Sequence, residues 1–312
     1  MRSGWLANAA AAARLVADRA DLWLPGALSS LAFLGWLPLV LAVVPLPDVS
    51  GLTFFGADLA TSGSYPWNVV LLSASILFGI LTLCLLVALG EAALQRALRS
   101  LQDGRDGDHH GDSLSGETAV TFIVILVALL PAAVATMVLA LAVVAVAPGE
   151  FQSPDIGGPV LVRVAGAVAP LLVLLLVLVL VGQALGSAAQ RRATGPRAEH
   201  LGPALAHAAG DVRSRPARVL GTAVVGMAAL ALLLVLSTLL LRVLWAPIAT
   251  ALGAGELSDP QTVLLLVGFV AIWLCLLLAG GALHAWASAW WSLELPPLAH
   301  PDRGPAEERE PA

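Results

Sequence analysis

Lysine is absent from this chain of 312 residues, and charge of either sign is scarce. All 16 basic residues are arginine, and charged residues make up 12% of the sequence. Without lysine there is no phosphate-loop lysine, no Schiff-base lysine and no kinase-type catalytic lysine. The exclusive use of arginine is typical of a GC-rich prokaryotic genome. The net charge of −5 comes largely from connectors and the C-terminal end, which argues against nucleic acid as a partner.

Cysteine and catalytic motifs are also scarce. Cys84 and Cys275 are the two cysteines, and each lies in an apolar segment, which predicts small buried hydrophobes and no disulfide framework. The motifs HExxH and GxSxG do not occur, and Ser73 and Ser75 have no general base beside them. The sequence therefore predicts no enzyme, no metal and no cofactor. A lipid-modifying intramembrane enzyme is the alternative, with no motif behind it.

Long apolar runs are what the chain has in abundance. The sequence is 59% hydrophobic, and six uncharged stretches reach the length of about 20 residues that crosses a bilayer. This predicts an all-α polytopic membrane protein with a six-span domain over residues 24–294. The expected spans are 24–46, 67–90, 119–147, 160–186, 218–247 and 261–289, with inner connectors 91–118 and 187–217. Residues 295–312 are expected to form a disordered acidic tail.

Arginine placement predicts the orientation of the spans. With the N-terminus inside, 14 of the 16 arginines fall on the inner side, and Arg163 and Arg242 fall toward the outer side. Inner loops of membrane proteins carry the excess of positive charge. Both termini are therefore expected in the cytoplasm, in a prokaryotic plasma membrane. Arg242, one turn inside the outer end of its span, is expected to reach the interface past Trp245.

Residues 1–23 predict an amphipathic helix that lies on the membrane surface, because Arg14 and Asp18 recur at helical spacing on one face. The stretch AAARLVADRADLWLPGAL near the first span is similar to AHAAGDVRSRPARVLGTA near the fifth, with Arg19 aligned on Arg215. A third amphipathic stretch, EAALQRALRSL, precedes the third span. The pattern predicts three hairpins of two spans, each preceded by a cytoplasmic amphipathic helix.

The stretches VADRADLWLPGAL and VRSRPARVLGTA also carry a resemblance to a protein family. A surface helix, an Arg-Pro or Arg-x-x-Leu entry and then a hairpin resemble the membrane domain attached to some glycerophosphodiester phosphodiesterases. Several related uncharacterised families of six-span prokaryotic membrane proteins share this plan. The resemblance implies the fold and brings no catalytic residues, because the phosphodiesterase domain itself has no counterpart in this chain.

The most chemically distinctive stretch is DGDHHGDSLSGE, residues 106–117. Its acidic residues and its central glycine fall at the calcium-ligand and turn positions of an EF-hand loop: Asp106, Asp108, Gly111, Asp112 and Glu117. His110 stands where an oxygen ligand is needed, Ser113 replaces an apolar residue, and no second loop exists to pair with this one. His109 and His110 could also attract a transition metal, but adjacent histidines in a connector are a weak pattern. We therefore expect a solvated linker.

Three polar residues are expected at similar depth near the inner ends of the even-numbered spans. Glu91, Gln183 and His284 follow glycines on spans two, four and six. Polar groups in a membrane cost free energy unless they face the bundle interior, a partner or the headgroups. We therefore expect these side chains to line a polar pocket that opens toward the cytoplasm. The alternative is that each reaches the inner headgroups independently.

Small residues predict where helices approach closely. Gly182 and Gly186 form a GxxxG pattern, and Gly281 with Ala285 continues a similar ridge on the sixth span. Such faces serve the bundle itself, a protein partner or a homo-oligomer, besides the lipid bilayer. The sequence favours a non-enzymatic membrane scaffold or accessory subunit. A permease subunit similar to those of ABC exporters, which also have six spans, is the alternative.

Overall fold

The computed structural model describes residues 4–44, 57–58, 61–103, 113–152, 160–194, 198–253 and 259–295. Over these ranges the chain is helical and contains no strand. Six helical segments are long and apolar enough to cross a membrane: Ala20–Val43, Trp67–Leu101, Leu114–Gly149, Ala169–Ala193, Pro216–Gly253 and Pro260–Glu294. The chain is therefore a multi-pass integral membrane protein, which confirms the all-helical class and the six candidate spans. The predicted tail beyond residue 295 lies outside the described residues.

The first crossing segment is not one regular helix. After α1 (Trp5–Asp18) and a short 3-10 turn, η1 (Ala20–Leu22), it consists of α2 (Trp23–Ser30), a π-helical stretch η2 (Leu31–Trp36) and α3 (Leu37–Val43). Pro38 has no N–H to donate to the carbonyl of Leu34, and its ring crowds that carbonyl. A wider turn just before a proline relieves both problems. Residues 24–46 were expected as one span, and the described part of it ends at Val44.

Seven further helices follow in the described chain: α5 (Trp67–Asp103), α6 (Leu114–Gln152), α7 (Val160–Ala167), α8 (Ala169–Ala193), α9 (Leu201–Ser214), α10 (Pro216–Gly253) and α11 (Pro260–Glu294). Two differ from expectation. Residues 91–101, expected as a separate amphipathic helix, are the last turns of an unbroken α5. The expected span 160–186 is interrupted at Val168, because Pro170 disfavours helical backbone before it and lacks an N–H.

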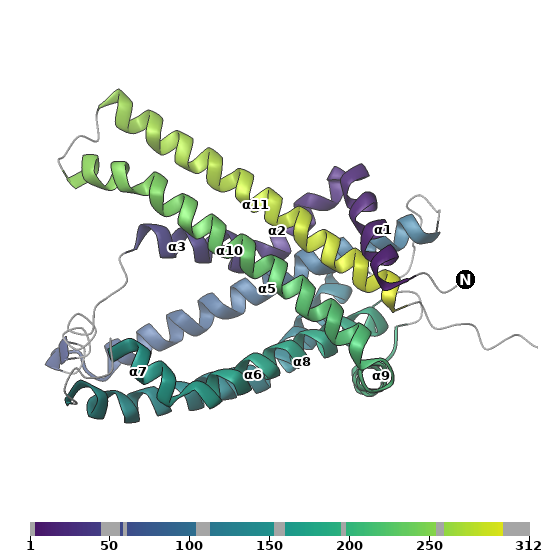
Figure 1. The fold of residues 1–312 in the computed structure, drawn as a ribbon, viewed down its shortest axis with the longest axis horizontal. Helices are drawn as coiled ribbons and strands as arrows, with labels where there is room; N and C mark the ends of the chain where they lie inside the picture. Colours follow the sequence, from purple (N-terminus) through teal and green to yellow (C-terminus); the bar gives the residue numbers. More distant parts are fainter. Residues whose placement is uncertain are drawn as a thin grey trace, which may run out of the picture.

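The helices meet at one end of the molecule and separate toward the other. Figure 1 shows α10 and α11 running side by side, while α6 and α8 form a second pair that diverges from them. We call the end that holds α1 and α9 the proximal end, and the end where α10 is joined to α11 the distal end. Helix α2 packs between α5 and α11, and α5 packs on α6, so α2 and α5 together connect the two pairs.

Apolar packing is concentrated at the proximal end. One core cluster joins α1, α5 and α11 through Ala12, Leu94, Leu98 and Trp290, all at most 3% exposed. In contrast, residues 69–78 of α5 are exposed at ten consecutive positions, which covers every face of more than two turns. The distal half of α5 therefore stands apart from the rest of the described chain.

Helices α1 and α9 are alike in length, packing and ending. Each has 14 residues, and each is followed by an arginine in a non-helical conformation, Arg19 or Arg215. Ala12 of α1 and Ala208 of α9, separated by the same 196 positions as the two arginines, are both fully buried. Helix α1 packs on α11, and α9 packs on α8. The internal similarity seen in the sequence is therefore matched by two helices that each bury one face on the proximal end.

Candidate functional site: a polar network between four helices

Glu91 is the centre of a buried polar group at the proximal end. Its carboxylate lies on α5, where the residue is 8% exposed. Glu91 Oε2 lies 2.8 Å from His284 Nε2 of α11, and Oε1 accepts hydrogen bonds from Ser288 Oγ (3.0 Å) and Gln95 Nε2 (3.1 Å). Gln95 follows Glu91 by four residues and Ser288 follows His284 by four, so each pair shares one helix face. Both carboxylate oxygens are thereby satisfied.

Arg191 brings a second helix to the same place. From α8 its guanidinium reaches α11 and donates to Ser288 O (2.7 Å), Ser288 Oγ (3.0 Å) and Ser292 Oγ (3.2 Å). The hydroxyl of Ser288 thus accepts from Arg191 and donates to Glu91. A half-buried cation and a buried anion are therefore linked through one hydroxyl, which helps to compensate both charges.

The network continues toward α6. Thr194 Oγ1 lies 2.9 Å from Gln95 Oε1 and accepts from Arg99 Nη1 at 3.1 Å. Arg99 also pairs with Glu117 of α6, and Arg96 Nε lies 3.4 Å from the other oxygen of that carboxylate. Glu117, which stands at the last ligand position of the calcium-loop pattern, was expected in a solvated linker, but it lies on α6, where it is 6% exposed and engaged by two arginines. Residues 106–112 of that loop lie outside the described residues.

The structure brings together two of the three residues expected in a pocket. Glu91 and His284 are in direct contact, whereas Gln183 is exposed on α8 and forms no hydrogen bond with another described residue. Gln183 precedes Arg191 by eight residues, about 12 Å along a helix. Helix α8 diverges from α11 with increasing distance from the proximal end (Figure 1), which is consistent with the exposure of Gln183 among the described residues. Gly90, Gly182 and Gly281 were expected to lie at the same depth, together with the polar residue that follows each glycine. This expectation fails for Gln183, which lies more than two turns from Arg191.

Other members of the network were missed by the sequence argument. Arg191, Arg99 and Glu117 were taken only as interfacial charges or as part of the acidic loop. A signal was present, because a buried carboxylate on α5 requires a nearby cation, and Arg191 and Arg192 lie in the same inner region, in the last turn of α8. Ser288 and Gln95 carried no signal beyond their spacing of four residues from His284 and Glu91.

The predicted packing residues lie at close helix crossings. A side chain at Gly182 would collide with the carbonyl of Ala128 on α6, and one at Gly186 would lie 3.0 Å from the methyl group of Ala128. A side chain at Gly281 would strike the backbone of α2 at Trp23 and Ala27. Ala285, one turn further, is fully buried in the cluster that joins α1, α5 and α11. These small residues let backbones approach within the bundle itself.

The arrangement can hold charges in place and connect four helices, α5, α6, α8 and α11, over about two helical turns of the proximal end. It also offers an acid and an imidazole in direct contact, with a guanidinium linked to the acid through Ser288. Proton and anion pathways in membrane proteins use such groups. Among the described residues no group of three or more histidine, cysteine or acidic side chains is placed to bind a metal ion. Comparison with protein-family models, curated proteins and solved structures finds no match for this chain.

Proposed function

We infer that this protein is a non-enzymatic membrane scaffold or accessory subunit, and that it binds a transmembrane helix of a partner protein along the distal half of α5. The observation that carries the proposal is the exposure of every face of α5 between residues 69 and 78. A further prediction, from the distribution of arginines, is that both termini lie in the cytoplasm of a prokaryotic plasma membrane.

The chemistry of this helix supports contact with another helix as well as with lipid. Ser75 and Gly79 are four residues apart, so they present two small residues on one face, and no atom lies within 4 Å of where a Gly79 side chain would begin. Pairs of small residues at this spacing allow transmembrane helices to approach closely. In this chain the comparable pair Gly182 and Gly186 is already occupied by α6, whereas the face of Gly79 is open.

The proximal network supports the same role from the other side. Because Glu91, Arg191 and Glu117 connect four helices at the proximal end, that end serves as a fixed base from which the distal halves extend. Because α5 is packed at the proximal end and exposed at residues 69–78, a partner helix can bind its distal half without disrupting the packing of the bundle.

Photo-crosslinking in native membranes tests the proposal. A photoreactive residue at Phe78, which is 73% exposed, is expected to give one discrete protein adduct, and Gly79→Leu is expected to remove it. Leu264 of α11, 71% exposed, is the matched control and should give lipid adducts alone. The adducted protein should co-purify with this chain when the tag is moved to that protein. Lipid adducts alone at both positions would contradict a partner, and an adduct of twice the chain mass would mean self-association.

A permease subunit is the second candidate function. It is favoured by the contact between Glu91 and His284, because titratable groups within membrane spans often mark proton or substrate paths. Against this candidate, the connector 187–217 is long for an ABC-type permease, and it contains α9, which is docked on α8 through Arg192 and Asp211. If the protein is a permease, wild type should transport a substrate into liposomes and a folded Glu91→Gln variant should not. If it is a scaffold, neither wild type nor the variant should show flux.

A further inference from the structure

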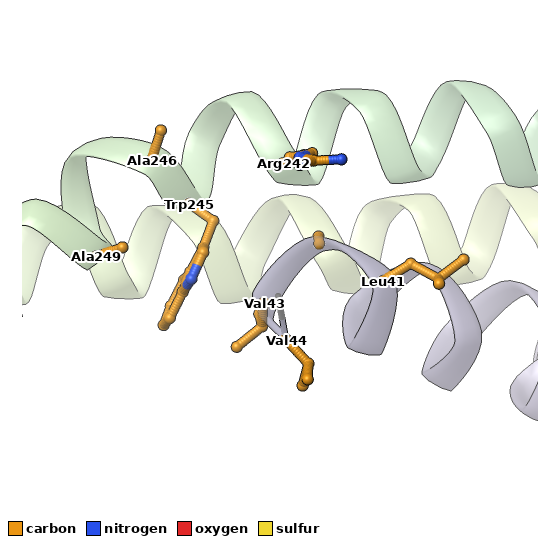
Figure 2. A pocket seen from close by; sticks show the side chains of 8 residues that line it. Leu41, Val43, Val44, Arg242, Trp245, Ala246 and Ala249 are labelled. Atoms are coloured by element: carbon orange, nitrogen blue, oxygen red, sulfur yellow. The ribbon is translucent and has the colours of Figure 1, made fainter. Parts of the chain in front are cut away.

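A cavity of about 330 Å³ lies at the distal end, away from the polar network. Figure 2 shows it between α10, which contributes Arg242, Trp245 and Ala249, and the last turn of α3, which contributes Leu41 and Val43. Its volume is within the range of small-molecule binding sites. All of its lining side chains except Arg242 are uncharged, and most are aliphatic.

Arg242 faces this cavity without a counter-charge. The residue is exposed, and it forms no hydrogen bond or ion pair with another described residue. The arginines of the proximal end differ in this respect, since Arg191, Arg192 and Arg99 are each bound to carboxylates or hydroxyls. A guanidinium next to an apolar cavity therefore keeps all five N–H donors for a ligand.

The position of Arg242 along α10 places it at headgroup depth. Arg218 and Arg242 are 24 positions apart, and residues 219–241 between them carry no charge. That spacing corresponds to about 36 Å along a helix, and the hydrocarbon core is about 30 Å thick. With Arg218 at the proximal interface, a helix tilted by about 20° brings Arg242 to the distal interface. The cavity therefore has a charged rim at headgroup depth.

Trp245 supports the same depth. It follows Arg242 by three residues, and its ring packs on Phe269 of α11 at a centroid distance of 5.3 Å. Tryptophan is enriched where a bilayer meets water, because one end of its ring is apolar and the other carries an N–H. Arginine and tryptophan on one face of α10, above an aliphatic lining, form a surface with a polar rim and an apolar floor.

We propose that this cavity binds one anionic phospholipid of the distal leaflet. The phosphate accepts hydrogen bonds from the guanidinium of Arg242, and an acyl chain lies along Leu41 and Val43. Charge-assisted contacts between arginine and phosphate are among the stronger hydrogen bonds in proteins. Because Arg242 has no counter-charge among the described residues, it selects a lipid with net negative charge over a zwitterionic one. This site is independent of the partner surface on α5.

Native mass spectrometry of the full chain in a neutral detergent tests the proposal. Phosphatidylglycerol is titrated in, and phosphatidylcholine with the same acyl chains serves as the zwitterionic probe. Wild type should retain one phosphatidylglycerol preferentially, and Arg242→Gln should weaken its binding about fivefold, the effect of one interfacial cation. Arg163→Gln on α7 is the matched control and should leave binding unchanged.

Cavity filling separates a true site from a cation that merely attracts headgroups. Ala249→Phe keeps Arg242 and fills the cavity with a larger side chain, so this variant should also weaken phosphatidylglycerol binding. If Ala249→Phe does not fold, Ala246→Phe is used in its place. Unchanged binding in a folded filling variant would overturn the proposal. Equal retention of the two lipids, or displacement by millimolar inorganic phosphate, would also overturn it, since the site would then select neither charge nor lipid.

Discussion

Glu91 and His284 are 193 positions apart in the chain, yet Glu91 Oε2 lies 2.8 Å from His284 Nε2. The contact joins the second crossing helix to the last one, two helices that are not neighbours in sequence. Around it, Ser288 and Arg191 extend the same polar group to α8. The helices of the proximal end are therefore joined by polar contacts between side chains from distant parts of the sequence.

Removing the charge of Glu91 should destabilise the protein. Glu91→Gln removes the anion that Ser288 links to the half-buried guanidinium of Arg191. Removing one partner of a fully buried pair costs about 3–5 kcal/mol in unfolding free energy, and the loss for this bridged, half-buried pair should be smaller than that. Thermal denaturation in detergent should show a clear fall in Tm. Gln183→Leu is the matched control, because Gln183 is exposed and has no hydrogen-bond partner among the described residues. Its effect should stay within about 0.5 kcal/mol, and equal losses in the two variants would contradict the network.

Gly281 should tolerate no side chain. A methyl group there would collide with the carbonyl of Trp23 and with the backbone of Ala27, so Gly281→Ala must push α2 away from α11. Overpacking of this kind costs about 1–3 kcal/mol. Gly268→Ala on the same helix is the control, since no atom lies within 4 Å of its new methyl group. That change should be neutral or stabilise α11 by up to about 1 kcal/mol, as measured by Tm. A similar Tm for the two variants would argue against the α2–α11 crossing.

The orientation of the spans is testable with reporter fusions. A reporter enzyme that is active only outside the cytoplasm should be active when fused after Gly63, Gly157 or Gly255, because the arginine distribution places these connectors outside. Fusions after Gly195 should be inactive. Activity in the reverse pattern would invert the topology, and it would place Arg242 in the inner leaflet.

Residues 106–117 should not bind calcium specifically. Position 5 of the loop is His110, which supplies no oxygen, and the expected bidentate ligand Glu117 already pairs with Arg96 and Arg99. Calorimetry of the purified protein should show no saturable calcium binding below about millimolar, the range of weak modules. Micromolar binding that disappears in Asp106→Ala would refute this prediction.

Much of the fold could be predicted from the sequence because the bilayer restricts what can cross it. An uncharged run such as 219–241 has to be helical, since each backbone N–H and C=O must be satisfied within the segment. The π-helical turn at Leu31–Trp36 could not be located in this way, although Pro38 marks the disturbance that it accommodates. The continuation of α5 through residue 103 was also missed, because amphipathic spacing looks the same in a separate helix and in the end of a long one.

The site could be predicted in part. Glu91 and His284 stand out because ionisable groups are expensive within a membrane and need a partner. Gln183 was grouped with them because it also follows a glycine near the inner end of a span. The depth of a residue in the membrane, however, depends on the tilt and divergence of its helix, and these cannot be read from a single sequence. Arg191 shows the converse. Its long side chain crosses from α8 to Ser288, 97 positions away, and such a contact has no local signature.

The docking of α1 on α11 sets an order for assembly during synthesis. Trp286 Nε1 donates to the carbonyl of Ala9, 277 positions earlier in the chain, and the ring of Trp290 packs on Trp5. Helix α1 leaves the ribosome first, and at about 5–20 residues per second its binding partners follow roughly 15–55 seconds later. During that interval the buried face of α1 lacks the α11 side chains that complete its core cluster. The contact between α1 and α11 therefore cannot form before α11 has been synthesised, and it reports that α11 is in place.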